Sequence, residues 1–337
     1  MPNPRSLGAV AAVVTTLTWG GQFVVAASAF DQVDPVWQTA IRYGSAGLVL
    51  LVLLAAVEGR TAFARDAQLP RVAVLGTIGF AGFNLLAFVG LTMTTPQAAS
   101  LIVSTMPLIT AFVLWARTGV VPRPATWWTS AVALLGVALV LGDGHVGRVL
   151  HGGVGWGELL VLLGATSWVV YTTGAATVPG WSPLRYTALS ASAGSVVIIA
   201  IAVALSAVGV LHAPAPVDVA AVGWQLAYIT LAAGVVAVLC WNHAMRALGA
   251  QDGVLFINLV PVTTFALQAL RGDSPHPGEL LGVAVTLAAL VASNLLARRA
   301  QPTSATSTSR TASSPRRTSS KEVESGESPI LSPSGSR

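Results

Sequence analysis

Long apolar stretches separated by short polar segments make up most of residues 1–300. Each is about 17 to 26 residues long, close to the roughly 20 residues with which an α-helix crosses a bilayer core. The predicted spans are residues 7–29, 35–57, 71–91, 96–116, 125–142, 157–178, 183–208, 219–244, 252–270 and 279–297. Nine or eleven crossings are alternatives, because the third and fourth stretches, and the eighth and ninth, follow each other closely. We predict an all-α integral membrane protein with ten transmembrane helices.

The fourth and ninth stretches resemble each other, which indicates an internal repeat. Residues 104–107 (Ser-Thr-Met-Pro) correspond to residues 258–261 (Asn-Leu-Val-Pro), and a glycine and then a proline follow each of them. Each half holds five spans, an odd number, so the second half enters the membrane from the opposite face and the repeat is inverted. The predicted parts are a first five-helix repeat (7–142), a loop (143–156), a second five-helix repeat (157–297) and a tail (298–337).

The tail is rich in Ser, Thr and Pro, and its basic residues include Arg310, Arg316, Arg317 and Lys321. A segment with so few large apolar residues cannot build a core, so we predict that it is disordered. The alternative is a basic, phosphorylatable segment that touches anionic lipid.

The first stretch has a second interpretation, as a signal peptide. Arg5 precedes it, and Ala27-Ser28-Ala29 resembles a cleavage site. A membrane span is favoured because Trp19-Gly20-Gly21-Gln22 interrupts the apolar core, and a corresponding Trp recurs in the sixth span, which cannot be a signal.

Composition agrees with lipid as the solvent, since apolar residues make up 54% of the chain and charged residues 9%, against roughly 25% charged residues in soluble domains. The lone Cys240 excludes an internal disulfide. Basic residues are scattered among short loops, which argues against nucleic-acid binding.

Five arginines mark the loops after spans two and four as cytoplasmic: Arg60, Arg65, Arg71, Arg117 and Arg123. We therefore predict a plasma-membrane (inner-membrane) protein with both termini in the cytoplasm.

Motifs of soluble enzymes are missing from the sequence. It contains no Gly-x-x-x-x-Gly-Lys loop, no His-Glu-x-x-His motif and no cluster of Cys and His. We predict that the protein is not an enzyme and has no catalytic residue, cofactor or metal, so its energy comes from a gradient rather than from ATP.

Polar side chains inside apolar spans indicate function, because a bilayer penalises unpaired polar groups. Trp19 and Gln22 lie three residues apart on one helical face, and Trp168 and Tyr171 repeat this spacing in the sixth span. An inverted pair of such faces would surround one central site. Interfacial anchoring or helix packing by the Trp rings is the alternative.

Span four carries a polar stripe of Gln97, Ser100 and Ser104 that ends beside Pro107, and Asn258 and Pro261 occupy the corresponding places in span nine. A proline removes a helical hydrogen bond, and carriers bind substrates at broken helices near the bilayer midplane. Ordinary interhelical hydrogen bonding is the alternative. Further candidates for substrate binding are Asn84, Trp241 and Asn242.

Two charged residues complete the set. Arg42 lies roughly 10 Å along its helix from Pro35. It either binds a carboxylate-bearing substrate, or it snorkels toward the outer surface or pairs with carbonyls. Glu158, near the start of span six, is the best candidate for proton coupling, with a helix-starting role as the alternative. Because no acid lies near a span centre, facilitated efflux down the substrate gradient is favoured over proton antiport.

Several of these residues resemble the drug/metabolite transporter superfamily, and more narrowly its ten-helix EamA-type members. They are Trp19-Gly20, residues 96–101 (Pro-Gln-Ala-Ala-Ser-Leu), residues 105–107 (Thr-Met-Pro) and residues 258–261. The resemblance covers about residues 8–297 and implies an inner-membrane carrier of small metabolites, often an exporter of amino acids or drugs. The chain departs from the family where Gly-Glu usually follows spans four and nine, since it has Gly119-Val120 and Gly272-Asp273 there.

The predicted function is a secondary transporter of a small neutral or zwitterionic metabolite, working outward by alternating access at a midplane site, as a monomer or homodimer. The alternative is a non-transporting scaffold or lipid-handling accessory protein, which would not need inward-facing Gln97, Tyr171 and Asn258. A membrane enzyme is less favoured, because the span interiors offer no carboxylate or His pair for acid–base work.

Overall fold

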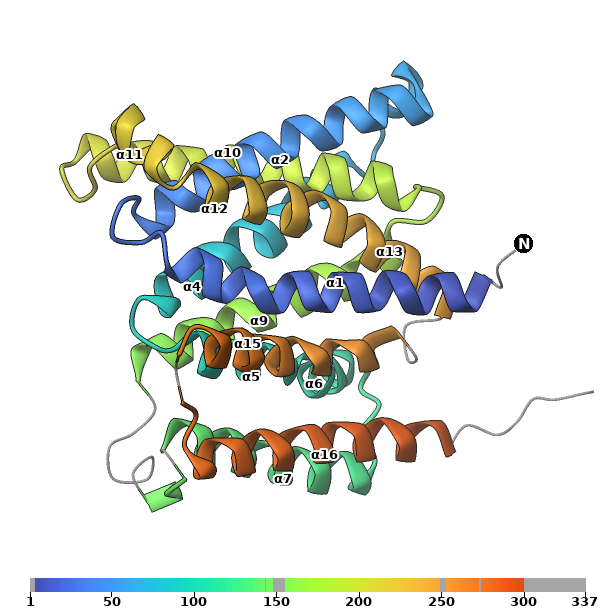
Figure 1. Cartoon of the computed structure of the whole chain (residues 1–337). Coiled ribbons are helices and arrows are strands. Elements are labelled where there is room, and N and C mark those ends of the chain that lie inside the picture. Colours follow the sequence, from blue (N-terminus) through green and yellow to red (C-terminus); the bar gives the residue numbers. More distant parts are fainter. Residues whose placement is uncertain (1–3, 143, 148–154, 249–252, 273, 300–337) are drawn as a thin grey trace, which may run out of the picture. The chain divides into compact units, whose positions relative to one another are not determined.

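The computed structural model describes residues 4–142, 144–147, 155–248, 253–272 and 274–299, and every regular element within these ranges is a helix (Figure 1). Residues 1–300 form one compact unit. Most of the predicted loop over 143–156 and the predicted disordered tail lie outside the described residues.

The first half of the chain holds α1 (Pro4–Ala27), α2 (Pro35–Glu58), the 3-10 turn η1 (Arg60–Phe63), α3 (Leu69–Gly76), the π-helical η2 (Thr77–Gly82), α4 (Phe83–Leu91), α5 (Pro96–Ser104), α6 (Met106–Thr118) and α7 (Pro124–Leu141). The second half holds α9 (Trp156–Gly174), η3 (Ala175–Thr177), α10 (Pro183–Ala207), α11 (Pro216–Ala221), α12 (Gly223–Ala227), the π-helical η4 (Tyr228–Val236), α13 (Ala237–Leu248), the 3-10 turn η5 (Val254–Asn258), α15 (Leu259–Leu270) and α16 (Pro277–Arg299). Each predicted span falls on one or more of these helices.

The eighth predicted span shows the largest shift in its bounds. The long helix runs from Gly223 to Leu248 rather than over residues 219–244. Pro216 starts a separate short helix, α11, and the backbone of Val222 (φ −111°, ψ 23°) interrupts the path between α11 and α12. The apolar pattern continues through this interruption, so it could not reveal the break.

Seven helices of the described chain are long and apolar enough to cross a membrane, or eight if the bent pair α5–α6 counts as one span. The apolar parts of the last two spans, Phe256–Leu270 and Pro277–Ala289, are shorter. In α2, Leu50 and Leu54 are buried whereas Leu48 and Val52 are exposed, so the outward face is as apolar as the inward face. An apolar outer face suits lipid rather than water, and the chain is a multi-span membrane protein.

Local sequence sets where the helices begin and end. Many begin at a proline, whose fixed φ suits the first turn. Asp34, Thr95 and Ser182 precede α2, α5 and α10, and their side-chain oxygens accept backbone N–H groups at 2.8, 3.2 and 2.9 Å. Gly119 (φ +72°) ends α6 and Gly272 (φ +100°) follows α15, a left-handed conformation that glycine adopts without strain.

Five predicted spans contain irregular helix, and in the sixth it is the 3-10 turn η3 at the end of the span. The third and eighth include the π-helical segments η2 and η4, and such turns are frequent at functional sites. The fourth bends by 43° between α5 and α6, at Thr105 and two residues before Pro107, which has no N–H to donate. The ninth changes from the 3-10 turn η5 to α15 just before Pro261. The predicted helix-break prolines thus lie beside irregular backbone.

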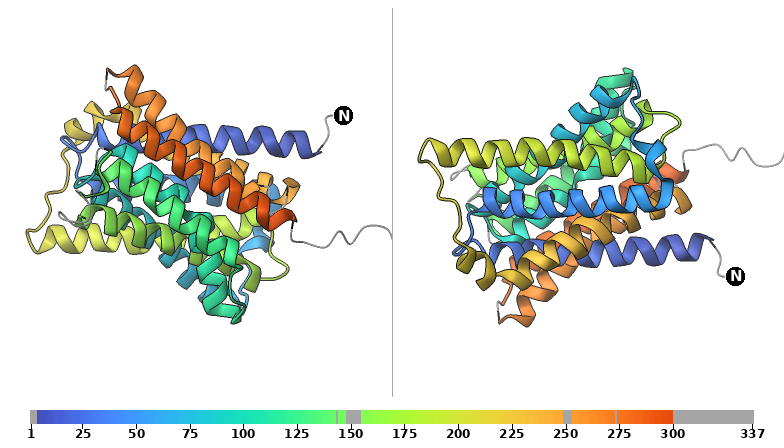
Figure 2. Two further views of the ribbon diagram at one scale, coloured as in Figure 1. Left: turned by 90° about the horizontal axis from the view of Figure 1, so that it is seen from below. Right: turned by 90° about the horizontal axis from the view of Figure 1, so that it is seen from above.

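Helices that are distant in the sequence pack in pairs. α7 lies beside α16, and α2 lies beside α10 (Figures 1 and 2). α1 packs against α13 and α15, while α9 packs against α4, α5 and α6. Glycines bring some of these helices very close: a Cβ atom at Gly136 of α7 would lie 2.6 Å from the carbonyl oxygen of Gly282 on α16. Such small-residue contacts are typical of helix packing in membranes.

Candidate functional site

Arg42 of α2 is buried, with 1% of its surface exposed. Its Nη2 donates to Gln22 Oε1 of α1 at 2.6 Å, and its Nη1 donates to Asn84 Oδ1 of α4 at 3.3 Å. The rings of Tyr43 and Phe88 lie with their centroids 4.7 and 5.4 Å from its Cζ atom. Three predicted site residues therefore form one hydrogen-bonded network, and both partners of the guanidinium are neutral amides.

Aromatic rings form a cluster beside this network. The ring of Trp19 on α1 meets Trp168 of α9 edge to face at a centroid distance of 6.3 Å, and Trp241 of α13 at 5.3 Å. Trp168 also contacts Tyr171 at 5.1 Å. The Trp19 Nε1 atom donates to the carbonyl oxygen of Ala233 in η4 at 3.2 Å. The structure thus brings together the three predicted tryptophans and Tyr171.

A cavity of about 30 Å³ lies between the guanidinium network and the aromatic cluster. Its lining consists of the polar residues Gln22 and Arg42, the aromatic residues Trp19, Phe23, Tyr43, Phe83 and Trp168, and the apolar residues Val103, Met106, Val238, Ile257 and Val260. This space has room for about two water molecules. A whole metabolite can enter only if the helices around the cavity move apart.

Other predicted residues lie outside the lining of this cavity. Asn84 is held behind Arg42, with its Nδ2 donating to Phe80 O at 2.9 Å. The Tyr171 hydroxyl and Ser190 Oγ share a hydrogen bond of 3.1 Å. Asn242 Nδ2 donates to Thr187 Oγ1 at 2.7 Å, and Trp241 packs against Trp19 of the cavity lining. These side chains support the site rather than face it.

The two serines of the polar stripe of span four form hydrogen bonds within their own helix. Ser100 Oγ donates to Gln97 O at 2.8 Å, and Ser104 Oγ donates to Leu101 O at 2.7 Å, both within their own helix. In contrast, Gln97 Oε1 and both polar side-chain atoms of Asn258 are buried without a hydrogen-bond partner. Buried amides are nearly always paired. Asn258 lies at the junction of η5 and α15, one residue from Ile257 of the cavity lining.

Glu158, the predicted coupling residue, lies in the first turn of α9. Its Oε1 accepts a hydrogen bond from Thr94 Oγ1 at 2.5 Å. An acid in the first turn also interacts favourably with the helix dipole. The geometry therefore favours the helix-starting role and joins α9 to the turn before α5.

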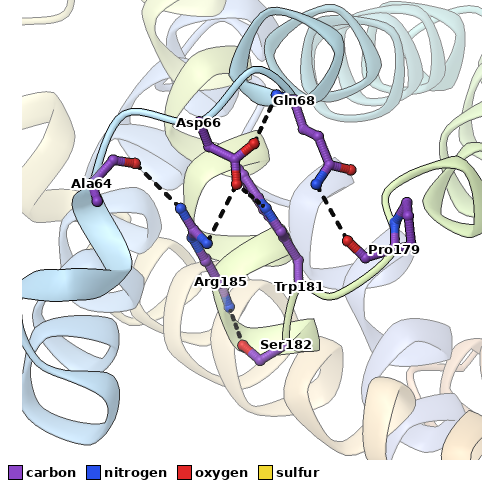
Figure 3. Close-up of polar contacts among 7 residues, drawn as sticks. All are labelled: Ala64, Asp66, Gln68, Pro179, Trp181, Ser182 and Arg185. Atoms are coloured by element: carbon purple, nitrogen blue, oxygen red, sulfur yellow. Dashed lines mark hydrogen bonds and ion pairs between the residues drawn. The ribbon is translucent and has the colours of Figure 1, made fainter. Parts of the chain in front are cut away.

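A second polar cluster ties the loop after α2 to the loop before α10 (Figure 3). The carboxylate of Asp66 accepts from the backbone N–H of Gln68 at 2.9 Å and from Trp181 Nε1 at 2.8 Å, and Arg185 Nη1 lies 3.7 Å from it. Arg185 also stacks on Trp181, with 4.0 Å from its Cζ to the ring centroid, and donates to Ala64 O at 3.2 Å. The hydrogen bond from Gln68, followed by the one from Trp181, holds the pKa of Asp66 below its usual value.

Sequence reasoning missed the aromatic and apolar residues of the cavity, notably Tyr43, Phe83 and Met106. Such residues are common on every face of a membrane helix, so their type carries no signal. Tyr43 follows Arg42 directly in the sequence, and this adjacency was the one sequence signal that could have indicated a lining residue.

Comparison with known proteins gives the family. Residues 6–142 and 155–295 each match the EamA-like transporter family. The chain is 28% identical over 297 residues to the "Uncharacterized transporter YrdR" of Bacillus subtilis (strain 168), covering 87% of this chain and 92% of that protein. It is 30% identical over 286 residues to the "Uncharacterized transporter YyaM" of the same organism, covering 82% and 90%.

A solved structure described as "Crystal structure of protein" superposes with a TM-score of 0.63 at 22% identity, covering 87% of this chain and 98% of that one. At this identity the likeness concerns the fold. The family matches together cover most of the chain, and they confirm the resemblance seen in the sequence and the prediction of a transporter rather than an enzyme. The chain belongs to the EamA-like transporter family.

Proposed function

We propose that this protein is a secondary carrier that moves a small metabolite by alternating access, with the cavity between Arg42 and Trp168 as its substrate site. The observation that carries this proposal is the cavity itself, which has a polar wall and an aromatic wall and lies among helices of both halves of the chain. Ligand sites of this kind combine apolar walls with a few polar groups that fix orientation.

We further propose ten membrane-spanning helices in two inverted five-helix repeats, residues 7–142 and 157–297. The two family matches support this division. So does the packing, because α1 packs against α13 and α15 in the way that α9 packs against α4 and α5–α6. The π-helical segments η2 and η4 occupy corresponding places in the two halves, as do the breaks near Pro107 and Pro261.

The proposed orientation places both termini in the cytoplasm. The start of α1, the loop after α2 and the end of α16 lie at the same end of the helical unit (Figure 1). That end carries Arg60 and Arg65, and cytoplasmic loops of membrane proteins are enriched in such residues. Export from the cytoplasm across the plasma membrane is the proposed direction.

The small volume of the cavity supports a cycle in which an occluded state alternates with states open to either side. The bend at Thr105 and the π-helical segments η2 and η4 lie in helices that contribute to the cavity. Irregular backbone of this kind is where transporter helices hinge and bind substrate. Because Glu158 has a structural partner in Thr94, facilitated movement down the substrate gradient is the proposed mode of energy use.

The test is a comparison of metabolite accumulation in cells that produce the wild-type protein, the Trp168→Ala variant or neither. Cells with the wild-type protein should hold less of a defined set of metabolites and release more into the medium. Liposomes with the purified protein should then equilibrate the same compounds. The proposal is wrong if no metabolite differs between the wild-type protein and the variant at equal membrane levels.

A further inference from the structure

We propose that Arg42 binds the carboxylate group of a singly charged substrate, so that the carrier selects monocarboxylates. This inference rests on the proposed function, and it replaces a broad class of small metabolites by one defined charge. It follows from what surrounds the guanidinium, from where its free donors lie and from the charge of the cavity.

The charge of Arg42 lacks a counter-ion among the described residues. Its hydrogen-bond partners Gln22 and Asn84 are neutral, and the ion pair found within the described ranges joins Arg185 to Asp66 and does not involve Arg42. The electrons of the Tyr43 and Phe88 rings offset part of the charge. A buried charge is normally paired with an opposite one, because its removal from water is costly. One negative charge from a ligand would therefore compensate the guanidinium charge of Arg42.

The guanidinium also keeps donors for a ligand. It carries five N–H bonds, and its hydrogen bonds to Asn84 and Gln22 use one on Nη1 and one on Nη2. One N–H on each of Nη1 and Nη2 remains, and the side chain forms part of the cavity lining. The Nε atom, also without a hydrogen-bond partner, lies beside Gly234 of η4. Two parallel N–H donors match the two oxygens of a carboxylate. The adjacent amide of Gln22 is available to the same ligand, since it also lines the cavity.

Charge balance favours a single negative charge. Arg42 is the one ionic residue in the cavity lining, and the remaining lining residues are Gln22 and apolar or aromatic side chains. A monocarboxylate would make the loaded site neutral, whereas a phosphate dianion would leave one uncompensated negative charge in an apolar environment. A cation would add to the charge that is already buried. The aromatic rings of Trp19 and Trp168 are suited to the organic part of the ligand.

The inference is tested by ligand-dependent thermal stabilisation of the purified full-length protein. The probes are sodium acetate, butyrate, benzoate and 3-phenylpropionate, each compared with its own carboxamide at constant ionic strength. Ligands that bind the folded state raise its unfolding temperature in proportion to occupancy. At least one acid should bind about tenfold or more tightly than its amide, the ratio expected when a charged hydrogen-bond partner is lost.

Two variants separate charge from fold. Arg42→Lys keeps the charge but loses the paired donors, so it should bind the acid with intermediate affinity, and Arg42→Gln should no longer distinguish acid from amide. Arg185→Gln is the matched control, because it removes an arginine that lies outside the cavity lining. If Arg42→Gln does not fold, the comparison of acid and amide binding to the wild-type protein still decides whether the site prefers a carboxylate.

Acids that bind no better than their amides, or an acid preference that persists in Arg42→Gln, would overturn the inference. Transport of compounds without a carboxylate would overturn it too, while leaving the proposed carrier function intact. Failure to transport any metabolite would contradict the proposed function, and the binding measurement would still decide the role of Arg42.

Discussion

The indole rings of Trp19 and Trp168 meet edge to face, with their planes at 89° and their centroids 6.3 Å apart. They come from α1 and α9, which are the first helices of the two family matches. Edge-to-face contacts of this kind contribute roughly 0.5–1.5 kcal/mol beyond the burial of surface. This pair therefore links the beginnings of the two halves at the wall of the cavity.

Replacing Trp168 tests the importance of that wall. Trp168→Ala removes the edge-to-face partner of Trp19 and enlarges the cavity, so transport of the metabolites identified in cells should fall about tenfold or more, a loss of about 1.4 kcal/mol. Trp168→Phe keeps an aromatic ring and should retain more activity. Initial rates in liposomes, normalised to the inserted protein, provide the measurement. Equal rates for the Ala and Phe variants would show that the ring has no special role.

Asp66→Asn tests the cluster between the two loops. The lowered pKa of Asp66 means that its ionised form is stabilised in the folded protein. Its contribution to stability is therefore fully present above the ordinary carboxyl value of about 3.9. That contribution disappears as pH falls through the lowered folded-state pKa. The wild-type protein should unfold at a higher temperature than Asp66→Asn at pH 7, and this difference should vanish at strongly acidic pH.

The control for this comparison is Asp31→Asn, which removes an exposed carboxylate at the opposite end of α1 and α2. Its unfolding temperature should follow the wild type across the pH range. A difference between wild type and Asp66→Asn that is the same at every pH would contradict a role for the ionised carboxylate.

Glu158→Gln distinguishes two roles of Glu158, stabilising the start of α9 and coupling transport to protons. If Glu158 acts through its contact with Thr94, the variant should lose some stability but should still equilibrate substrate without a pH gradient. Thr94→Ala removes the same contact and should behave alike. Uphill accumulation driven by an imposed pH gradient, present in the wild type and lost only in Glu158→Gln, would instead identify the carboxylate as the coupling group.

Gly136→Val tests the close approach of α7 and α16. A Cβ atom at this position would lie 2.3 Å from Thr286 Oγ1 and 2.6 Å from Gly282 O, so the helices must separate. Overpacking of this kind typically costs about 1–3 kcal/mol. The yield of folded protein in detergent should fall sharply. Gly223→Ala, where a Cβ meets nothing within 4 Å, should leave the yield unchanged.

Single cysteines test the orientation. In a Cys240→Ser background, Arg60→Cys should resist a membrane-impermeant thiol reagent in intact cells, and Asp31→Cys should react with it. Both positions are exposed, so a failure to react reflects their side of the membrane. The reverse pattern of labelling would invert the proposed topology.

Much of the helix layout could be read from the sequence, because the thickness of the bilayer sets the length of apolar stretches. Prolines and glycines such as Pro124 and Gly119 marked the ends of helices for local reasons. The π-helical segments η2 and η4 were not predicted, since an extra residue in a turn leaves no mark in a continuously apolar stretch. The interruption at Val222 was hidden for the same reason.

The candidate site was only partly predictable. Trp19 and Gln22 were placed on one face by their spacing, and both line the cavity. Their partners depend on how helices pack, so the sequence could not show that Gln22 meets Arg42 or that Trp19 meets Trp241. Ser100 appeared as a lining residue by its spacing, yet its hydroxyl bonds to its own helix, an option open to any buried serine.

The hydrogen bond from Trp19 to Ala233 joins the wall of the cavity to a carbonyl inside η4. In a π-helical turn the backbone bonds run to the fifth residue instead of the fourth, so rewinding this segment into regular α-helix would reassign its carbonyl acceptors and rotate the residues that precede it. A change in the winding of η4 is therefore coupled to the orientation of the Trp19 indole on α1. We therefore expect a change in the winding of η4 to change the shape of the cavity beside Arg42.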